Sequence, residues 1–275
     1  ELDEGFYSNS KLDWIEDSVG AGQKVSQSSL RRGYNTPFIS IEDNDFDGLM
    51  KRIDKTNPDK TDRLINNTVG IILPKGFRAK LLVDKEAQRR YMEVLKARKK
   101  TGKIYMMDEE NSNKNSSPVY KELGLSVITT NICTEFLQPL FPDLTSVCVI
   151  SALNGTHWDE IEKNPQMIKD AFMFLDIVNE EYIKLSEGVP FLEKANKSAK
   201  EKRDIGLGFL GLAELFQMKG YAYGDMYSRA LNNKIFSTIR QYGEETTKEL
   251  GEKLGSLKYC KRADRVRGNA FLLMI

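Results

Sequence analysis

The most strand-like run in this chain is Thr145-Ser-Val-Cys-Val-Ile-Ser-Ala152. After it come residues 165–185, where apolar side chains recur at helical spacing and predict an amphipathic helix. The same alternation continues in both directions along the chain. Short strands are predicted at 36–41, 68–73, 103–107 and 270–275, and helices at 84–100, 203–218 and 227–253. Short strands that alternate with helices predict an α/β architecture.

The predicted helix over 203–218 begins with the motif Gly206-Leu-Gly-Phe-Leu-Gly211, which matches G-x-G-x-x-G. A dinucleotide-binding fingerprint also needs a strand just before it and an acidic residue about 20 positions later. The preceding residues, 198–204, are too polar for a buried parallel strand, and Glu214 and Asp225 come too early. We therefore reject a dinucleotide site and expect the glycines to let the start of a helix pack closely.

The other segments are predicted to be mostly loops. A short helix is expected near 12–17 within an otherwise irregular stretch up to residue 34, and a helical turn at 45–52. Residues 54–63 and 111–118 are polar and are predicted to be loops. Residues 126–136 alternate as an extended segment would.

Composition excludes several classes of protein. Lys and Arg number 41 and Asp and Glu 40, so the chain lacks the basic surplus of a nonspecific nucleic-acid binder. No apolar run reaches the length of about 18 residues that a membrane span needs, and no signal peptide is recognisable, so we expect no membrane partner. Three cysteines cannot close a disulfide framework, which favours a cytoplasmic location. The one histidine, His157, argues against a His-rich metal site and is interpreted as a surface residue.

The sharpest candidate for chemistry is Asn131-Ile-Cys-Thr-Glu135. In an extended segment, positions i and i+2 point to the same side, so Asn131, Cys133 and Glu135 would project together. An amide, a thiol and a general base would then share one small surface. The alternative is that Cys133 is a small buried apolar residue in a strand, with no role in chemistry.

The remaining candidates carry weaker signals. Cys148 lies in an apolar run, so a structural role is the simpler interpretation. Cys260 lies in a basic stretch that continues to Arg267, and a solvated face is a simpler explanation for that stretch than phosphate binding. The loop at 54–63 is either a ligand loop or a connection, and its composition does not separate the two.

The sequence resembles part of the large (catalytic) subunit of ribonucleotide reductase. Asn-x-Cys-x-Glu at 131–135 is the most specific element of this resemblance, and Ile132 and Thr134 within it resemble the oxygen-dependent class I enzymes. The segments that carry the resemblance follow the family's order and span nearly the whole chain: Gln27–Gly33, Pro37–Ile41, Asn66–Pro74, Thr101–Tyr105, Thr130–Glu135, Ser146–Asn154, Arg203–Gly208, Gly211–Ala213 and Arg267–Ala270.

The resemblance implies a role for each matching residue. Cys133 would be the transient thiyl radical that abstracts the 3′-hydrogen of a ribonucleotide, and Glu135 the general base on the 3′-hydroxyl. Asn131 would hydrogen-bond the substrate hydroxyls, and Cys148 would be half of the redox pair that reduces the 2′-position. A base two residues from the sulfur is well placed, because a radical beside an ionised 3′-oxygen expels a 2′-hydroxyl more easily. The loop at 54–63 would correspond to the substrate-specificity loop.

The resemblance also implies a fold and partners. Residues 1–275 would form the central portion of a single catalytic domain, part of a ten-stranded α/β barrel with the segment 131–135 on a central finger loop. We expect the chain to be incomplete on its own, with the second redox cysteine and the phosphate loop supplied by another chain or a longer polypeptide. No cofactor would bind here, because a metal-containing small subunit supplies the radical. The other partners would be a ribonucleotide substrate, a nucleoside triphosphate effector, a second large subunit, and thioredoxin or glutaredoxin.

Two alternatives stay open at this point. The chain could be a non-catalytic relative that binds nucleotides or regulates another subunit, with no dependence on Cys133 or Glu135. It could also be a different radical enzyme that shares the barrel.

Overall fold

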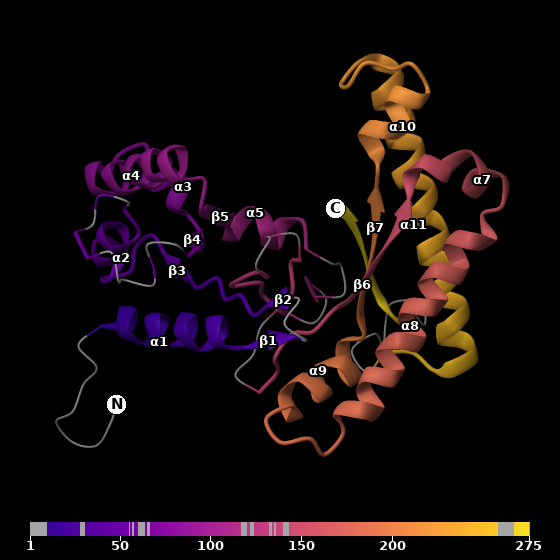
Figure 1. The fold of residues 1–275 in the computed structure, drawn as a ribbon, viewed down its shortest axis with the longest axis horizontal. Coiled ribbons are helices and arrows are strands. Elements are labelled where there is room, and N and C mark those ends of the chain that lie inside the picture. The colour runs from indigo at the N-terminus through magenta and orange to yellow at the C-terminus, as the bar shows by residue number, and fades with distance from the viewer. Residues whose placement is uncertain are drawn as a thin grey trace. The chain divides into compact units, whose positions relative to one another are not determined.

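The structure is a computed structural model, and its chain forms two compact units, which are considered separately (Figure 1). Unit 1 comprises residues 1–117 and 126–138, and unit 2 comprises residues 118–125 and 139–275. The prediction of a single domain over 1–275 stays a prediction. The residues that the structure describes are 10–27, 31–54, 56, 58–59, 64, 67–116, 120–121, 124–131, 134, 136–139, 143–257 and 267–274.

Unit 1 is built on a parallel sheet with the order β3-β4-β5, so the predicted α/β pattern is confirmed here. Its strands are β3 (Phe38–Ser40), β4 (Val69–Leu73) and β5 (Ile104–Asp108), beside a separate antiparallel pair, β1 (Ser26–Gln27) and β2 (Arg31–Arg32). Its helices are α1 (Lys11–Lys24), α2 (Phe46–Ile53), α3 (Phe77–Lys80), α4 (Lys85–Thr101) and α5 (Glu109–Lys114).

Local capping sets the ends of α4, which matches the predicted helix over 84–100. The Asp84 side chain accepts hydrogen bonds from the backbone N–H groups of Glu86 and Ala87, which would otherwise lack a partner at the helix start. Gly102 ends the helix in the left-handed conformation, with φ of 67°.

Two of the loop predictions in unit 1 are wrong. Helix α1 runs on to Lys24, well past the short helix expected near 12–17, because its Ser10 cap and packing against the core outweigh its two glycines. The segment expected as a loop from residue 111 begins inside α5, whose start is capped by the Asp108 side chain. The predicted loop at 54–63 lies largely outside the described residues.

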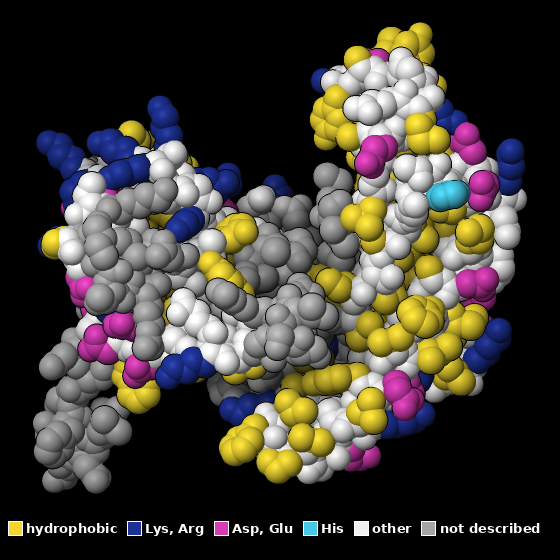
Figure 2. Space-filling view, in the orientation of Figure 1, with side chains coloured by type: hydrophobic (Ala, Val, Ile, Leu, Met, Phe, Trp, Pro, Cys, Tyr) yellow, Lys and Arg dark blue, Asp and Glu magenta, His cyan; other side chains and the backbone are white. Residues whose placement is uncertain are grey.

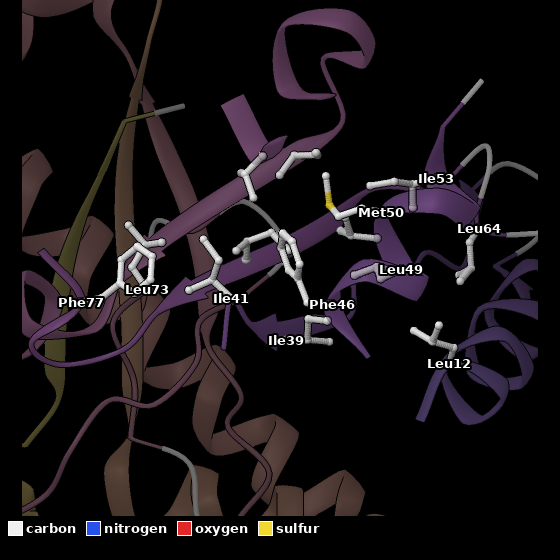
Figure 3. Packing of buried hydrophobic residues seen from close by; sticks show 14 of the residues in the cluster. Leu12, Ile39, Ile41, Phe46, Leu49, Met50, Ile53, Leu64, Leu73 and Phe77 are labelled. Carbon is white, nitrogen blue, oxygen red and sulfur yellow. The ribbon is translucent and has the colours of Figure 1, made fainter. Parts of the chain in front are cut away.

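The core of unit 1 gathers between the sheet and α2 (Figure 3). Its fully buried members include Ile41, Phe46, Leu49, Leu64 and Ile71. Burial of each such side chain contributes about 1.5–3 kcal/mol.

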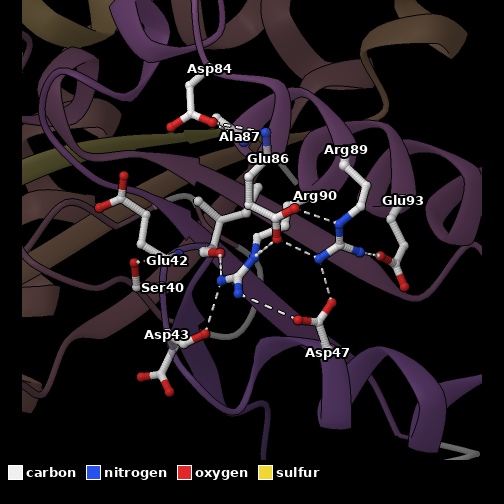
Figure 4. A network of polar contacts seen from close by, with 11 residues as sticks. Ser40, Glu42, Asp43, Asp47, Asp84, Glu86, Ala87, Arg89, Arg90 and Glu93 are labelled. Carbon is white, nitrogen blue, oxygen red and sulfur yellow. Dashed lines mark hydrogen bonds and ion pairs between the residues drawn. The ribbon is translucent and has the colours of Figure 1, made fainter.

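A polar network lies at the surface of the same unit (Figure 4). The Arg90 guanidinium donates to the carbonyl oxygens of Ile41 at 2.9 Å and Asp43 at 3.0 Å, and it pairs with Glu86 at 2.9 Å and Asp47 at 3.4 Å. Helix α4 is thereby joined to the turn between β3 and α2.

Unit 2 is built on a second parallel sheet, β6-β7-β8, with helices between its strands. The strands are β6 (Val149–Asn154), β7 (Asp204–Leu210) and β8 (Asn269–Met274). The helices are the 3-10 turn η2 (Gly155–His157), α7 (Trp158–Lys163), α8 (Gln166–Ser186), α9 (Glu193–Lys202), α10 (Leu212–Met218) and α11 (Met226–Leu254).

Helices α8 and α11 lie side by side along this sheet (Figure 1). Their contact is close at Gly243 of α11, where a Cβ atom would come within 2.7 Å of the Phe172 ring. The predicted helices over 165–185 and 227–253 are both confirmed. Apolar side chains are also numerous on the surface of unit 2 (Figure 2). Phe174 and Ile177 of α8 are among the exposed ones.

The prediction of one helix over 203–218 is wrong, because its first half is the central strand β7. Six of the seven residues of β7 are buried, and the strand pairs with β6 on one side and β8 on the other. Only Gly211 behaves as expected of a helix start, since it precedes α10 with φ of 74°. Gly206 and Gly208 lie within the strand and not in a phosphate-binding turn, so the rejection of a dinucleotide site agrees with the geometry.

Strand β6 begins at Val149, four residues later than predicted. The residues before it have other partners: Thr145 N–H donates to the carbonyl of Lys194 at 3.4 Å, and Ser146 contacts Lys202. Within the described residues, β6 and β8 pair on one side only, as expected of part of a larger closed sheet. No described helix is long and apolar enough to cross a bilayer.

Candidate active site

The segment 126–138 of unit 1 carries the first predicted site residues, and Asn113 of α5 anchors its beginning. The Asn113 amide accepts the N–H of Val127 and donates to the carbonyl of Val127, both at 2.8 Å. This two-way bond imitates a backbone pairing and ties the beginning of the segment to α5.

The extended conformation predicted for residues 131–135 is wrong. Thr134 has a φ of 63°, in the left-handed region, and its N–H donates to the carbonyl of Asn131 at 3.1 Å. An extended strand cannot form such a bond between positions three apart. The argument that side chains at 131, 133 and 135 share a face because they alternate therefore fails. Cys133 and Glu135 themselves lie outside the described residues.

Asn131 holds the two arms of this turn together. Its Oδ1 accepts the N–H of Phe136 at 2.9 Å, while the Thr130 hydroxyl donates to the carbonyl of Phe136 at 2.6 Å. Residues 132–135 thus lie between two hydrogen-bonded positions. The Asn131 Nδ2 makes no hydrogen bond with any described residue.

Cys148 lies in unit 2, immediately before β6, and is half-buried. Its thiol is 3.7 Å from the carbonyl oxygen of Val149. Val149 is in register with Ile205 of β7, so the residues just before this pair, Cys148 and Asp204, lie at the amino ends of neighbouring parallel strands. Cys148 therefore lies at the amino end of β6, where the sheet begins, and not among core residues as the sequence suggested.

A buried charged cluster surrounds this end of the sheet. The Lys202 ammonium lies 3.6 Å from Asp204 Oδ2, and only 3% of the Lys202 side chain and none of the Asp204 side chain is exposed. Asp204 Oδ1 accepts the Tyr120 hydroxyl at 3.1 Å. Lys202 also donates to the Ser146 hydroxyl at 2.5 Å. Burial lowers the pKa of Lys202, while the charges of Asp204 and of a Cys148 thiolate act to raise that pKa.

Sequence reasoning missed Lys202, Asp204 and Tyr120. Lys202 and Asp204 belong to a run of charged residues that is indistinguishable from an exposed surface. Lys202 ends α9 and Asp204 begins β7, and both are buried by tertiary packing that no local pattern in the sequence reports.

The other candidate residues are also compared with the structure. His157 is exposed and lies 3.5 Å from Glu160, so its interpretation as a surface residue is confirmed (Figure 2). The solvated-face interpretation is wrong for Arg267, which is largely buried and pairs with Asp176 at 3.0 Å and Glu180 at 3.2 Å. Cys260 lies outside the described residues.

Asn131 and Cys148 belong to different units, so each is placed only within its own unit. Among the described residues, no three His, Cys, Asp or Glu side chains gather as they would around a metal ion.

The model of the ribonucleotide reductase barrel domain matches residues 78–271, which is well over half of the chain. The chain belongs to this family. The matched region contains all four predicted site residues, Asn131, Cys133, Glu135 and Cys148. The prediction of an α/β fold that forms part of a ribonucleotide reductase barrel is thereby confirmed.

Similar proteins agree with this assignment. The chain is 32% identical over 167 residues to the ribonucleoside-diphosphate reductase large subunit of Invertebrate iridescent virus 3, with 61% of this chain and 26% of that protein covered. It is 29% identical over 177 residues to the large subunit of Caenorhabditis elegans, with 61% and 22% covered. The chain thus spans about a quarter of the length of these relatives.

The solved structure of the Actinobacillus ureae class Id ribonucleotide reductase alpha subunit superimposes with a TM-score of 0.87 at 24% identity. The match covers 98% of this chain and 50% of that subunit. The likeness establishes a common fold over nearly all of the chain.

Proposed function

We propose that this chain is the central barrel segment of a ribonucleoside-diphosphate reductase large subunit, an oxidoreductase that makes deoxyribonucleotides for DNA synthesis. The observation that carries this proposal is the barrel-domain match over 78–271, which includes the Asn-x-Cys-x-Glu element and Cys148. The relatives named as ribonucleoside-diphosphate reductase large subunits support a diphosphate substrate.

In the proposed reaction, Cys133 as a thiyl radical takes the 3′-hydrogen of the ribose, and Glu135 accepts the 3′-hydroxyl proton. The 2′-hydroxyl leaves as water. Cys148 and a second thiol from the remainder of the large subunit supply two electrons and become a disulfide. The 3′-hydrogen is then returned by Cys133 and the 3′-hydroxyl proton by Glu135, which regenerates the thiyl radical and the carboxylate. The products balance as one deoxyribonucleotide, one water and one disulfide for each ribonucleotide and pair of thiols.

Asn131 has two tasks in this proposal. Its Oδ1 is used within the protein, where it accepts the Phe136 N–H, while its Nδ2 is left to donate to a substrate hydroxyl. The hydrogen bond to Phe136 fixes the orientation of the amide, so the donor is oriented before substrate arrives.

The proposed assembly has several other members. A radical-generating small subunit with a metal centre would supply the oxidising equivalent, and this chain would bind no cofactor. The remainder of the large subunit, a second large subunit, a nucleoside triphosphate effector, and thioredoxin or glutaredoxin would complete the cycle in the cytoplasm. The class I assignment rests on Ile132 and Thr134.

Reduction of a ribonucleoside diphosphate by the complete assembly that contains this chain tests the proposal. Cys133→Ala is expected to abolish product formation while substrate binding persists. Cys260→Ala serves as the matched control, since Cys260 has no proposed role, and should retain activity. Turnover by the Cys133→Ala assembly would contradict the assignment of the radical residue. Effector binding with no turnover by the wild-type assembly would indicate a regulatory relative instead.

A further inference from the structure

The buried charges beside Cys148 need an explanation beyond the stability of unit 2. Removing an ammonium and a carboxylate from water is costly, and their mutual attraction rarely does more than offset that cost. Lys202 and Asp204 are among the most buried charged side chains of the described residues. Both lie near the amino ends of β6 and β7, where Cys148 precedes β6.

The contacts of Lys202 connect it to the chain that carries Cys148. Its Nζ donates to the hydroxyl of Ser146, two residues before the cysteine, at 2.5 Å, and to the carbonyl of Pro139 at 3.4 Å. These bonds hold the segment that leads into β6 against the end of α9. The remaining partner is Asp204, which the Tyr120 hydroxyl holds in place.

The charges that act on Lys202 are those of Asp204 and of a Cys148 thiolate. The neighbouring buried carboxylate, Glu201, acts on Lys197 of the same helix. Lys202 contacts Ser146, two residues before Cys148, and Asp204, which lies beside Cys148 at the start of the neighbouring strand, so this cluster places a buried cation close to Cys148. Without Lys202, the buried carboxylate of Asp204, at the start of the neighbouring strand, would oppose formation of the thiolate.

We propose that Lys202 is a positioning residue for Cys148: held by Asp204 and Tyr120, it fixes the Ser146–Cys148 segment and stabilises the thiolate of Cys148. This inference rests on the proposed function in one respect only, which is the redox role of the Cys148 thiol. A thiolate stabilised by a nearby cation is the form that exchanges with disulfides, which is what half of a redox pair must do once per turnover.

The rate of alkylation of Cys148 by iodoacetamide, followed against pH in the assembly that contains this chain, tests the proposal. Tandem mass spectrometry assigns the label, because the tryptic peptide 122–163 contains both Cys133 and Cys148. Lys202→Gln is expected to move the midpoint of the Cys148 profile upward by about one pH unit. At pH 6.5 the thiolate fraction falls about tenfold, and the greater nucleophilicity of the more basic thiolate leaves a rate decrease of about threefold.

Three further variants test whether the charge of Lys202 causes the shift of the Cys148 midpoint. Lys202→Arg keeps the charge and should keep the midpoint near that of the wild type. Asp204→Asn removes the opposing charge but keeps an amide oxygen that can accept from Lys202 and an amide N–H that can donate to the Tyr120 hydroxyl, so Lys202 stays held and the midpoint should move downward. Lys200→Gln is the matched control on the same helix, because Lys200 is exposed and pairs with Glu187 at 2.7 Å, so it should change nothing.

An unchanged midpoint in folded Lys202→Gln, or a shift of the same sign in Asp204→Asn, would overturn the proposal. Failure of the proposed function is a separate result, because it is read from nucleotide reduction by the wild type. The alkylation profile of Cys148 would still report on Lys202 in a chain that reduces no nucleotide.

Discussion

The ion pairs described in unit 1 lie at the protein surface, whereas unit 2 has buried ion pairs as well as surface ones. The partners of Arg90 in unit 1, Asp47 and Glu86, are 43% and 56% exposed. In unit 2 the ion pair of Arg203 and Asp176 is 8% and 5% exposed. Both units use three parallel strands with intervening helices, so the fold does not dictate this difference. A charge at the surface can be lost at little cost, while a buried charge depends on its partner.

The largest effect is expected from Asp176→Ala in unit 2. Asp176 accepts from Arg203 at 2.7 Å and Arg267 at 3.0 Å, so its removal leaves these two largely buried guanidinium groups with only the more exposed Glu180 as a shared carboxylate. The free energy of unfolding of unit 2 should fall by about 3–5 kcal/mol. Urea unfolding followed by the fluorescence of buried Trp158, in a Trp14→Phe background, measures this change.

Asp170→Ala is the control for that measurement. Asp170 is exposed on the same helix and accepts a hydrogen bond from the Gln166 side chain at 2.8 Å, so the loss should stay within about 0.5 kcal/mol. Equal losses in the two variants would show that burial of charge does not distinguish unit 2.

A second comparison uses one helical glycine from each unit. A Cβ at Gly243 of unit 2 would lie 2.7 Å from the rigid ring of Phe172, so Gly243→Ala should destabilise by about 1–3 kcal/mol. A Cβ at Gly48 of unit 1 would meet only the end of the Leu12 side chain, at 2.9 Å, which can move. Gly48→Ala should therefore be neutral or slightly stabilising, since alanine favours the helix.

Hydrogen exchange resolved by peptide measures both variants, over α11 for Gly243→Ala and over α2 for Gly48→Ala. Faster exchange in the first and unchanged or slower exchange in the second is the expected pair of results. Stabilisation by Gly243→Ala would mean that α8 and α11 do not pack as closely as described.

A smaller effect is expected from Arg90→Met in unit 1. The variant loses the bonds to the carbonyls of Ile41 and Asp43 and the contact with the Phe46 ring, 5.1 Å from the guanidinium carbon. The loss should be about 1–2 kcal/mol. Arg89 is more exposed and its partners are all carboxylates, so Arg89→Met should lower the stability less. Hydrogen exchange of β4, compared between the two variants, measures the difference. A larger loss in Arg89→Met would contradict the ranking of the two arginines.

The smallest effect concerns pH. Hydrogen bonds from Arg89 and Arg90 lower the pKa of Glu86 to about 2 from its ordinary value of 4.5. The folded state therefore binds fewer protons than the unfolded state between these values, and the contribution of Glu86 to stability is present above pH 4.5 and lost as the pH falls through about 2. Glu86→Gln should lower the midpoint of urea unfolding at pH 6 and leave it unchanged near pH 2.

Because Glu86 is exposed, high salt should remove most of the difference in urea midpoint between Glu86→Gln and the wild type at pH 6. A difference between Glu86→Gln and the wild type that persists at pH 2 would show that the charge is not responsible.

The sequence predicted those parts of the fold that depend on neighbours along the chain. Helix α4 was predicted from its composition and from Gly102, and α8 and α11 from apolar residues at helical spacing. Strands β4 and β5 were predicted from short apolar runs. Strand β7 was missed because glycines at 206 and 208 favour neither strand nor helix, and only pairing with β6 and β8 makes it a strand.

The sequence by itself determined the family, through the Asn-x-Cys-x-Glu element and the motifs on either side of it. It also determined the helices and strands whose signals are local, because periodicity and caps act over a few residues. The tertiary structure alone decided which charges are buried. Lys202 meets Ser146 from 56 residues away and Asp204 meets Tyr120 from 84 residues away. Desolvation and pairing of charge depend on what surrounds a side chain in space, and no pattern along the chain encodes those surroundings.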